Sequence, residues 1–129
     1  MRGLYRLSLL YRAIRARALL RGALRAVARF PQTRAKTPHG LSPRLVITLT
    51  SYPLRFNHLS KTLRSLLDQD TTVDAVELWV AEEDIDALPG DVKALTKHGL
   101  SIRPCRDIRS YKKLIPALES DPQAIYITA

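Results

Sequence analysis

The sequence predicts an α/β fold with a parallel β-sheet at its centre. The stretch Leu45–Thr50 is rich in β-branched and large aliphatic residues, and its apolar side chains fall on both faces, as in buried parallel strands. A helical pattern and a second apolar stretch, Ala75–Ala81, follow through short joints. Two shorter strand-like stretches come later in the chain. Because the apolar side chains of the first strand fall on both faces, we expect helices to cover both faces of the sheet.

Charge is divided very unevenly along the 129 residues, which suffice for one domain and an arm. Residues 1–67 contain 14 basic residues and no acidic residue, whereas residues 68–129 contain 7 basic and 12 acidic residues. The net charge of +9 therefore comes from the amino-terminal part. This asymmetry predicts an amino-terminal segment that seeks an anionic surface, and it does not favour a nucleic-acid-binding protein, for which a uniformly basic chain is typical.

Residues 1–30 are predicted to form a basic amphipathic helical arm that ends before Pro31, because leucine, alanine and arginine dominate. At about 100° per residue, the arm divides into two half-helices whose apolar faces differ by about half a turn. The first face comprises Leu4, Leu7, Leu10, Tyr11 and Ile14. The second face comprises Leu19, Leu20, Ala23, Leu24, Val27 and Phe30.

Eight arginines and no acidic residue on an apolar-faced helix are typical of a helix that lies on an anionic membrane surface. No run of ~18 apolar residues predicts a membrane-spanning helix. We therefore expect a cytoplasmic protein, peripheral at the inner face of the cell membrane. A transit peptide, a basic arm for nucleic acid and a frayed start without a role remain alternatives. A single serine argues against the first, and few aromatic residues argue against the second.

Residues 31–43 are predicted to be a linker because proline, glycine, serine and threonine are frequent, and the folded domain is expected over residues 44–129. After the first strand we expect a helix capped by Asn57 and ending near Gln69. The strand Ala75–Ala81 follows it. A strand, a helix and a strand with short joints form a right-handed parallel unit.

A second helix is expected to begin around Pro89 and to run to about His98, with Gly99 just beyond its end. A third short strand is expected over residues 100–103, closed by Pro104. The sequence therefore predicts a second helix-to-strand unit after the first.

Ser110 is expected to cap a helix toward Leu118, with a break or kink at Pro116. Residues 124–129 are expected to form the fourth strand. We predict core positions at Trp79, Tyr111, Leu114 and Leu118.

Several kinds of site are not predicted by this sequence. Cys105 is the only cysteine, so no intramolecular disulfide and no CxxC motif exists, as suits a reducing compartment. The three histidines, His39, His58 and His98, lack metal-ligand spacing. Neither a glycine-rich dinucleotide loop nor a P-loop is present, and no Ser-His-Asp or Cys-His arrangement is visible. Ordinary dinucleotide binding and nucleophilic catalysis are therefore disfavoured.

Polar side chains follow the predicted strands at their carboxyl ends, where ligands bind in open α/β sheets. They are Thr50, Ser51, Tyr52 and Arg55 after the first strand, Glu82 and Glu83 after the second, and Asp107, Arg109, Ser110, Lys112 and Lys113 after the third. Alternatively, the first group only caps a helix and shapes a turn, the acidic group is a solvated loop, and the lysines begin a solvent-facing helix. These residues predict a nucleotide or a small anionic ligand at this edge of the sheet.

Three segments also carry a resemblance: VITLTSYPLR at residues 46–55, ELWVAEE at residues 77–83 and DIRSYKKLIPAL at residues 107–118. Together they resemble a bacterial glycosyltransferase family with the GT-A fold, of the kind found in surface-polysaccharide loci. The resemblance extends over residues 44–129 and excludes the arm. It implies part of a Rossmann-like, nucleotide-binding domain.

The resemblance implies roles for the residues at the strand ends, with a nucleotide-sugar donor as the ligand. The loop that would lie against the nucleotide comprises Thr50, Ser51, Tyr52 and Arg55. Glu82 or Glu83 would accept hydrogen bonds from the base or ribose, and Lys112 or Lys113 would lie near the diphosphate. The resemblance identifies no catalytic residue in this chain.

In that family a strand like residues 124–129 leads into an acidic cluster of DxD type, which holds Mg²⁺ or Mn²⁺ against the donor diphosphate. The sequence ends at Ala129, before such a cluster. We therefore expect a truncated, inactive transferase without its metal ligands. The alternative is a non-catalytic basic protein that binds an anionic membrane or nucleic acid. Its fourth strand is expected to pair with the first and to leave Ile125 and Ile127 exposed.

Overall fold

The computed structural model describes residues 2–32 and 35–129, and the side chains of all of these except residues 2–7. The chain divides into two compact units, Met1–Gln32 and Thr33–Ala129, and we describe each by itself. Leu4 and Leu7, which we expected on the first apolar face of the arm, lie outside the described side chains.

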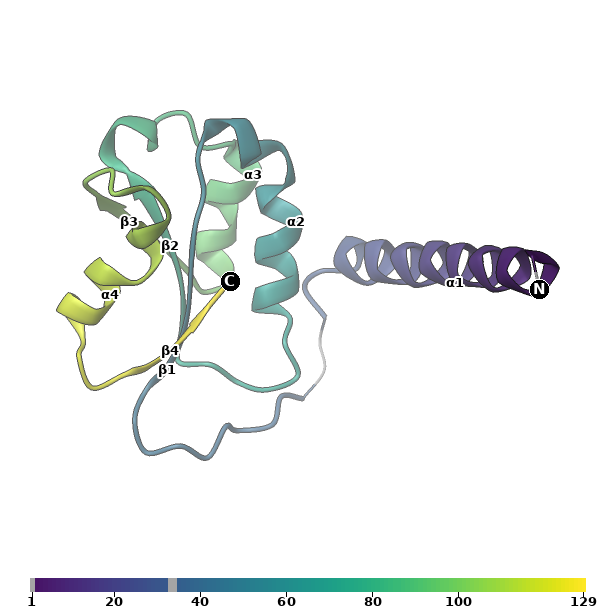
Figure 1. The fold of residues 1–129 in the computed structure, drawn as a ribbon. Helices are drawn as coiled ribbons and strands as arrows, with labels where there is room; N and C mark the ends of the chain where they lie inside the picture. The colour runs from purple at the N-terminus through teal and green to yellow at the C-terminus, as the bar shows by residue number, and fades with distance from the viewer. Residues whose placement is uncertain (1, 33–34) are drawn as a thin grey trace. The chain divides into compact units, whose positions relative to one another are not determined.

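The amino-terminal unit is the long helix α1 (Arg2–Ala28), which ends ahead of Pro31 as expected (Figure 1). Its apolar side chains do not gather on one side, in agreement with two half-helices whose faces differ. Among the described side chains of α1, the large apolar ones that are at least 45% exposed are those of Leu9, Leu10, Tyr11, Ile14, Leu19, Leu20 and Leu24. No helix within residues 2–32 and 35–129 is both long and apolar enough to cross a membrane.

The described part of the second unit contains a four-stranded, all-parallel sheet, which confirms the predicted α/β fold. Its strands are β1 (Leu45–Thr50), β2 (Ala75–Ala81), β3 (Leu100–Cys105) and β4 (Ile125–Thr128). The strand order is β3-β2-β1-β4, so β4 pairs beside β1 as expected. The chain steps from β1 outward to β3 and then returns to the other side of β1. The direction of the connections therefore reverses between β1 and β4.

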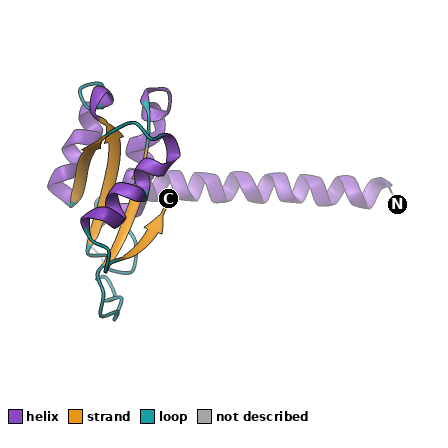
Figure 2. Ribbon diagram, turned by 60° about the vertical axis from the view of Figure 1, so that its left-hand side comes forward, coloured by secondary structure: helices purple, strands orange, loops and turns teal. Residues whose placement is uncertain are grey.

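Helices cover both faces of this sheet (Figures 1 and 2). One face carries α2 (Phe56–Leu67), α3 (Gly90–Lys93) and the short 3₁₀ helix η3 (Ala94–His98). The other face carries the 3₁₀ helix η4 (Arg109–Lys113) and α4 (Ile115–Ser120). This layered arrangement explains why β2 is buried along almost its whole length.

The core forms on both sides of β2. Leu63 of α2 and Leu78 of β2 are fully buried. On the side of α4, Trp79, Cys105 and Ala117 form a buried cluster, which confirms the predicted burial of Trp79. Ile125 and Ile127 of β4 are 40% and 49% exposed, as expected for this edge of the sheet.

The predicted start of α2 is wrong. A 3₁₀ turn, η1 (Pro53–Arg55), runs directly into the helix, so Arg55 is the N-cap and Asn57 lies inside the first turn. The helix ends at Leu67, slightly earlier than expected. Pro53 supplies the fixed backbone angle that begins this turn, and a capping side chain is not used.

The helix expected after Pro89 is α-helical only over Gly90–Lys93 and tightens into η3. Gly99 ends it with φ at 95°, in the left-handed region, as expected of the residue after a helix. Pro104 does not close the third strand, because β3 continues to Cys105. Since β3 lies at the edge of the sheet, the missing N–H of a proline is tolerated there.

The segment between β3 and β4 differs most from its prediction. Pro116 lies in the first turn of α4, where a proline needs no N–H partner, so it begins that helix and does not break it. Ser110 lies inside η4 and is not a helix cap. Tyr111 and Leu118, predicted as core, are 65% and 42% exposed. The 3₁₀ geometry of η4 has about three residues per turn, and Lys112 is the buried residue instead.

The residues that precede β1 are hydrogen-bonded to the domain. The backbone N–H of Thr37 donates to Asp70 O at 2.8 Å, and the N–H of Thr72 donates to Thr37 O at 2.8 Å. Asp74 Oδ2 accepts hydrogen bonds from the backbone N–H of Leu45 at 2.7 Å and pairs with His39 Nε2 at 3.0 Å. These contacts hold the segment before β1 at the amino ends of β1 and β2.

Candidate functional site

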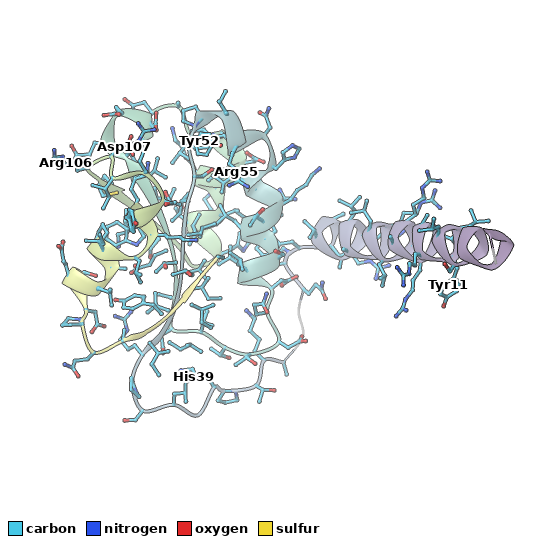
Figure 3. All side chains as sticks on the ribbon, viewed as in Figure 1. Tyr11, His39, Tyr52, Arg55, Arg106 and Asp107 are labelled. Atoms are coloured by element: carbon cyan, nitrogen blue, oxygen red, sulfur yellow. The ribbon has the colours of Figure 1, made fainter. Side chains whose placement is uncertain are left out.

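A pocket of about 360 Å³ lies at the carboxyl ends of the strands. Thr50, at the end of β1, and Ala129, just after β4, both line it. The pocket therefore sits where the direction of the connections reverses, which is the usual ligand site of open α/β sheets. Figure 3 shows Tyr52, Arg55 and Asp107 at this end of the domain, and His39 at the opposite end.

The loop after β1 forms one wall, made of Thr50, Ser51, Tyr52 and Arg55, as the sequence predicted. Thr50 Oγ1 donates a hydrogen bond to Trp79 O at 2.7 Å, which fastens the end of β1 to β2. Tyr52 is extended, and the N–H of Arg55 donates to Tyr52 O at 2.9 Å. This turn folds the loop back so that Arg55 returns to the pocket that Ser51 lines.

The segment after β3 forms the opposite wall, and its centre is an ion pair between a buried lysine and an exposed aspartate. Lys112 is 4% exposed, and its Nζ donates to Asp107 Oδ1 at 2.7 Å. The N–H of Arg109 donates to the same oxygen at 3.0 Å. These two hydrogen bonds, that from Lys112 first, hold the pKa of Asp107 below its ordinary value. Asp107 is therefore ionised at neutral pH and fixes the turn that begins η4.

The two lysines that the sequence could not distinguish have different positions. Lys112 is buried against Asp107, whereas Lys113 is half-buried with its Nζ 3.2 Å from Ala129 O. Both line the pocket. Because the charge of Lys112 is already balanced by Asp107, Lys113 is the lysine better placed to respond to a negatively charged ligand.

Comparison with known proteins gives no match: no family model, no curated protein and no solved structure is significantly similar to this chain. The fold and the chemistry of the pocket are therefore the basis for a functional proposal. The fold supplies a parallel sheet whose carboxyl edge holds charged side chains from the segments that follow β1, β2 and β3.

The predicted acidic site residues, Glu82 and Glu83, are exposed and do not line the pocket. They belong to a 3₁₀ turn, η2 (Glu82–Asp84), whose third residue, Asp84, lines the pocket instead. The run of acidic residues after β2 was the available signal for Asp84. A sequence pattern does not show which member of a tight turn faces a neighbouring loop, and so the residue was missed.

The pocket lining carries more positive than negative charge. Its basic residues are Arg55, Arg109, Lys112 and Lys113, and its acidic residues are Asp84 and Asp107. Arg55 and Arg109 are exposed to solvent, so their guanidinium groups can reach a ligand. Arg109 adopts φ of 58°, in the left-handed region, within the turn organised by Asp107. Guanidinium groups suit phosphate and carboxylate oxygens because they donate paired hydrogen bonds.

A smaller pocket of about 240 Å³ adjoins the first one. The two pockets share Thr50, Ser51, Arg55 and Ala129. The smaller pocket extends over α2, where its lining includes the apolar Leu54 and Leu59 together with the polar His58 and Thr62. Arg55 therefore lines both the pocket with many charged side chains and a neighbouring pocket in which it is the one Arg, Lys, Asp or Glu residue of the described lining.

The described residues do not fit the divalent metal that the resemblance to GT-A transferases implies. Within residues 2–32 and 35–129, no group of three or more histidine, cysteine or carboxylate side chains could hold a metal ion. Of the two carboxylates that line the pocket, Asp107 is already bonded through Oδ1 to Lys112 and Arg109.

Proposed function

We propose that this chain is a glycosyltransferase-like protein whose pocket binds a nucleotide-sugar donor. The observation that carries the proposal is a positively charged pocket at the carboxyl edge of a parallel sheet, beside the reversal between β1 and β4. Residues 46–55 and 107–118, which resemble bacterial transferases with the GT-A fold, supply most of the pocket lining. The proposal concerns binding of the donor and assigns no residue to the transfer step.

The diphosphate of the donor would bind to Arg55, Arg109 and Lys113. These three cations come from the two opposite walls of the pocket, and two of them are exposed. A diphosphate has two to three negative charges and several acceptor oxygens, and charge-assisted hydrogen bonds to it are about twice as strong as neutral ones. The Lys112–Asp107 pair, in which the lysine is buried, holds η4 in place, so Arg109 and Lys113 are positioned before the ligand arrives.

The nucleoside would bind between the loop after β1 and Asp84. Tyr52 is 47% exposed and offers an aromatic face on which a base can stack. Ser51 presents a hydroxyl at the same wall, and Asp84 offers a carboxylate that can accept hydrogen bonds from ribose hydroxyls. In this proposal Asp84 takes the role that the resemblance implies for Glu82 or Glu83.

Calorimetric titration of the full chain with nucleoside diphosphates and their sugar conjugates tests this proposal. We expect saturable 1:1 binding, and Arg55→Gln is expected to weaken it about 10- to 100-fold, because one charge-assisted contact is worth about 1.5–3 kcal/mol. The matched control is Arg44→Gln, which removes an exposed arginine that pairs with Asp121 and does not line the pocket.

Two outcomes would contradict the proposal. One is the absence of saturable binding for every nucleotide in the panel. The other is an equal loss of affinity in Arg55→Gln and Arg44→Gln, which would mean that phosphate binds to the basic surface without selecting the pocket.

A further inference from the structure

Helix α1 exposes large apolar side chains that the described residues of its own unit do not cover. Leu19 and Leu20 are 65% and 59% exposed, and Tyr11 and Ile14 have the same two values. None of residues 8–32 is buried. A helix with this much exposed apolar surface indicates an interaction partner.

The carboxyl-terminal half of α1 separates apolar from charged residues more cleanly than the amino-terminal half. Arg17, Arg21, Arg25 and Arg29 recur every four residues, so they form one row along the helix. The apolar residues of this half, from Leu19 to Val27, occupy a separate arc around the axis at about 100° per residue, although Leu24 at its edge lies only about 20° from Arg17. In the amino-terminal half, Leu9 falls between Arg2 and Arg12 around the axis, so apolar and charged residues are interleaved there.

A straight helix can place only one of these two sides in an apolar layer. Leu9 is displaced from Leu20 by only about 20° around the helix axis and therefore shares the side of the carboxyl-terminal half. Tyr11 and Ile14 lie on the opposite side. Because α1 is continuous over 27 residues, burial of one side leaves the other side in water.

The chemistry of α1 selects its partner. Eight arginines without an acidic residue require an anionic surface, and the leucine side requires an apolar layer beneath it. A bilayer with anionic headgroups offers both, and long arginine side chains can reach the phosphates while their stems cover apolar surface. Nucleic acid lacks the apolar layer, and a second copy of α1 would bring sixteen like charges together.

We propose that α1 binds an anionic lipid surface through its carboxyl-terminal half, with Leu19, Leu20 and Leu24 toward the acyl chains. Tyr11 and Ile14 face water in this arrangement. The helix lies on the membrane and does not cross it. This surface is separate from the pocket and does not depend on nucleotide binding.

Co-sedimentation of the full chain with vesicles tests this arrangement. Vesicles of phosphatidylcholine with phosphatidylglycerol are expected to bind the chain at least about tenfold more strongly than phosphatidylcholine alone. Leu19→Gln with Leu20→Gln is expected to weaken binding about 30-fold or more. Tyr11→Gln with Ile14→Gln, which changes side chains of equal exposure, is expected to change it less than about threefold. Both double variants introduce two glutamines, which are good helix formers, so a difference in binding between them does not come from a loss of helix.

A second double variant tests whether binding needs the positive charge of the arginines. Arg21→Gln with Arg25→Gln is expected to weaken binding to the anionic vesicles about 30-fold and to leave the weak binding to phosphatidylcholine unchanged. Three results would overturn the proposal. The first is an equal loss of vesicle affinity in the two apolar double variants, and the second is binding to duplex DNA without binding to vesicles. The third is a chain that does not bind vesicles but self-associates, with the self-association abolished by Leu19→Gln with Leu20→Gln.

Discussion

The arm and the domain use the same kinds of apolar residue in opposite ways. Unit Met1–Gln32 has eight arginines and no acidic residue, whereas Thr33–Ala129 has 13 basic and 12 acidic residues. The domain buries leucines between a sheet and helices, as Leu63 and Leu78 show, but α1 exposes leucines such as Leu19 and Leu20 to solvent. The domain therefore draws its stability from its own core, whereas the exposed leucines of α1 add little to the stability of that helix.

The largest effect should come from removing a buried leucine in the domain. Leu63→Ala, in α2, is expected to lower the free energy of unfolding by about 2.7–5 kcal/mol, because it leaves a cavity at a fully buried position. Leu24→Ala, in α1, is expected to change it by less than about 0.5 kcal/mol, because Leu24 is 46% exposed. Urea denaturation followed by the fluorescence of Trp79 measures both. Equal losses would mean that the arm is part of the same cooperative core.

A smaller effect is expected from acid, and only in the domain. The pKa of Asp74 is lowered, chiefly by the hydrogen bond from the N–H of Leu45, and the pKa of Asp107 is lowered chiefly by Lys112. Groups with a lowered folded-state pKa stabilise the domain above the ordinary value of 3.8 and lose that contribution as the pH falls through the folded-state pKa.

The urea midpoint should therefore fall between pH 5 and pH 2, limits chosen to lie roughly either side of the usual Asp range. Asp74→Asn and Asp107→Asn should flatten this pH dependence. The arm has no carboxylate side chain, so its helix content should not follow the same curve. A midpoint that is constant over this range would contradict the role given to the two carboxylates.

The smallest effect concerns one hydroxyl that joins β4 to α4. Tyr126 Oη donates to Ala117 O at 2.7 Å and lies 3.0 Å from Asp121 O, and burial raises the pKa of this phenol. Tyr126→Phe is expected to cost about 1 kcal/mol of unfolding free energy, as for one lost hydrogen bond. Tyr111→Phe is the control, because Tyr111 is 65% exposed. An equal loss of unfolding free energy in Tyr111→Phe and Tyr126→Phe would contradict the role given to the Tyr126 hydroxyl.

The fold could be predicted where burial on both faces is strong. The bounds of β1 and β2 follow from continuous apolar stretches, and a parallel sheet follows from the helical pattern between them. The prolines were harder to interpret. Pro104 reads as a strand end and Pro116 as a helix break, but the first lies on an edge strand and the second in a first turn. Those placements depend on strand order and on the preceding 3₁₀ helix, which no local pattern encodes.

The site could be predicted in part, for a related reason. Thr50, Tyr52 and Arg55 follow a strand with a clear end, so their place at the sheet edge follows from topology. The orientations of the Lys112 and Asp84 side chains depend on 3₁₀ turns. In such a turn, a shift of one residue changes which side chain faces the pocket. The sequence therefore identified the edge of the sheet but not every side chain that reaches it.

The central claim is that a phosphate-bearing ligand binds to the pocket and not to the arginines of the arm. Amide chemical shifts of the isotope-labelled full chain, recorded while a nucleoside diphosphate sugar is added, test this directly. We expect saturable shifts in residues 50–55 and 107–113, with only weak, non-saturating changes in residues 8–32. Shifts concentrated in the arm, with the pocket unchanged, would contradict it.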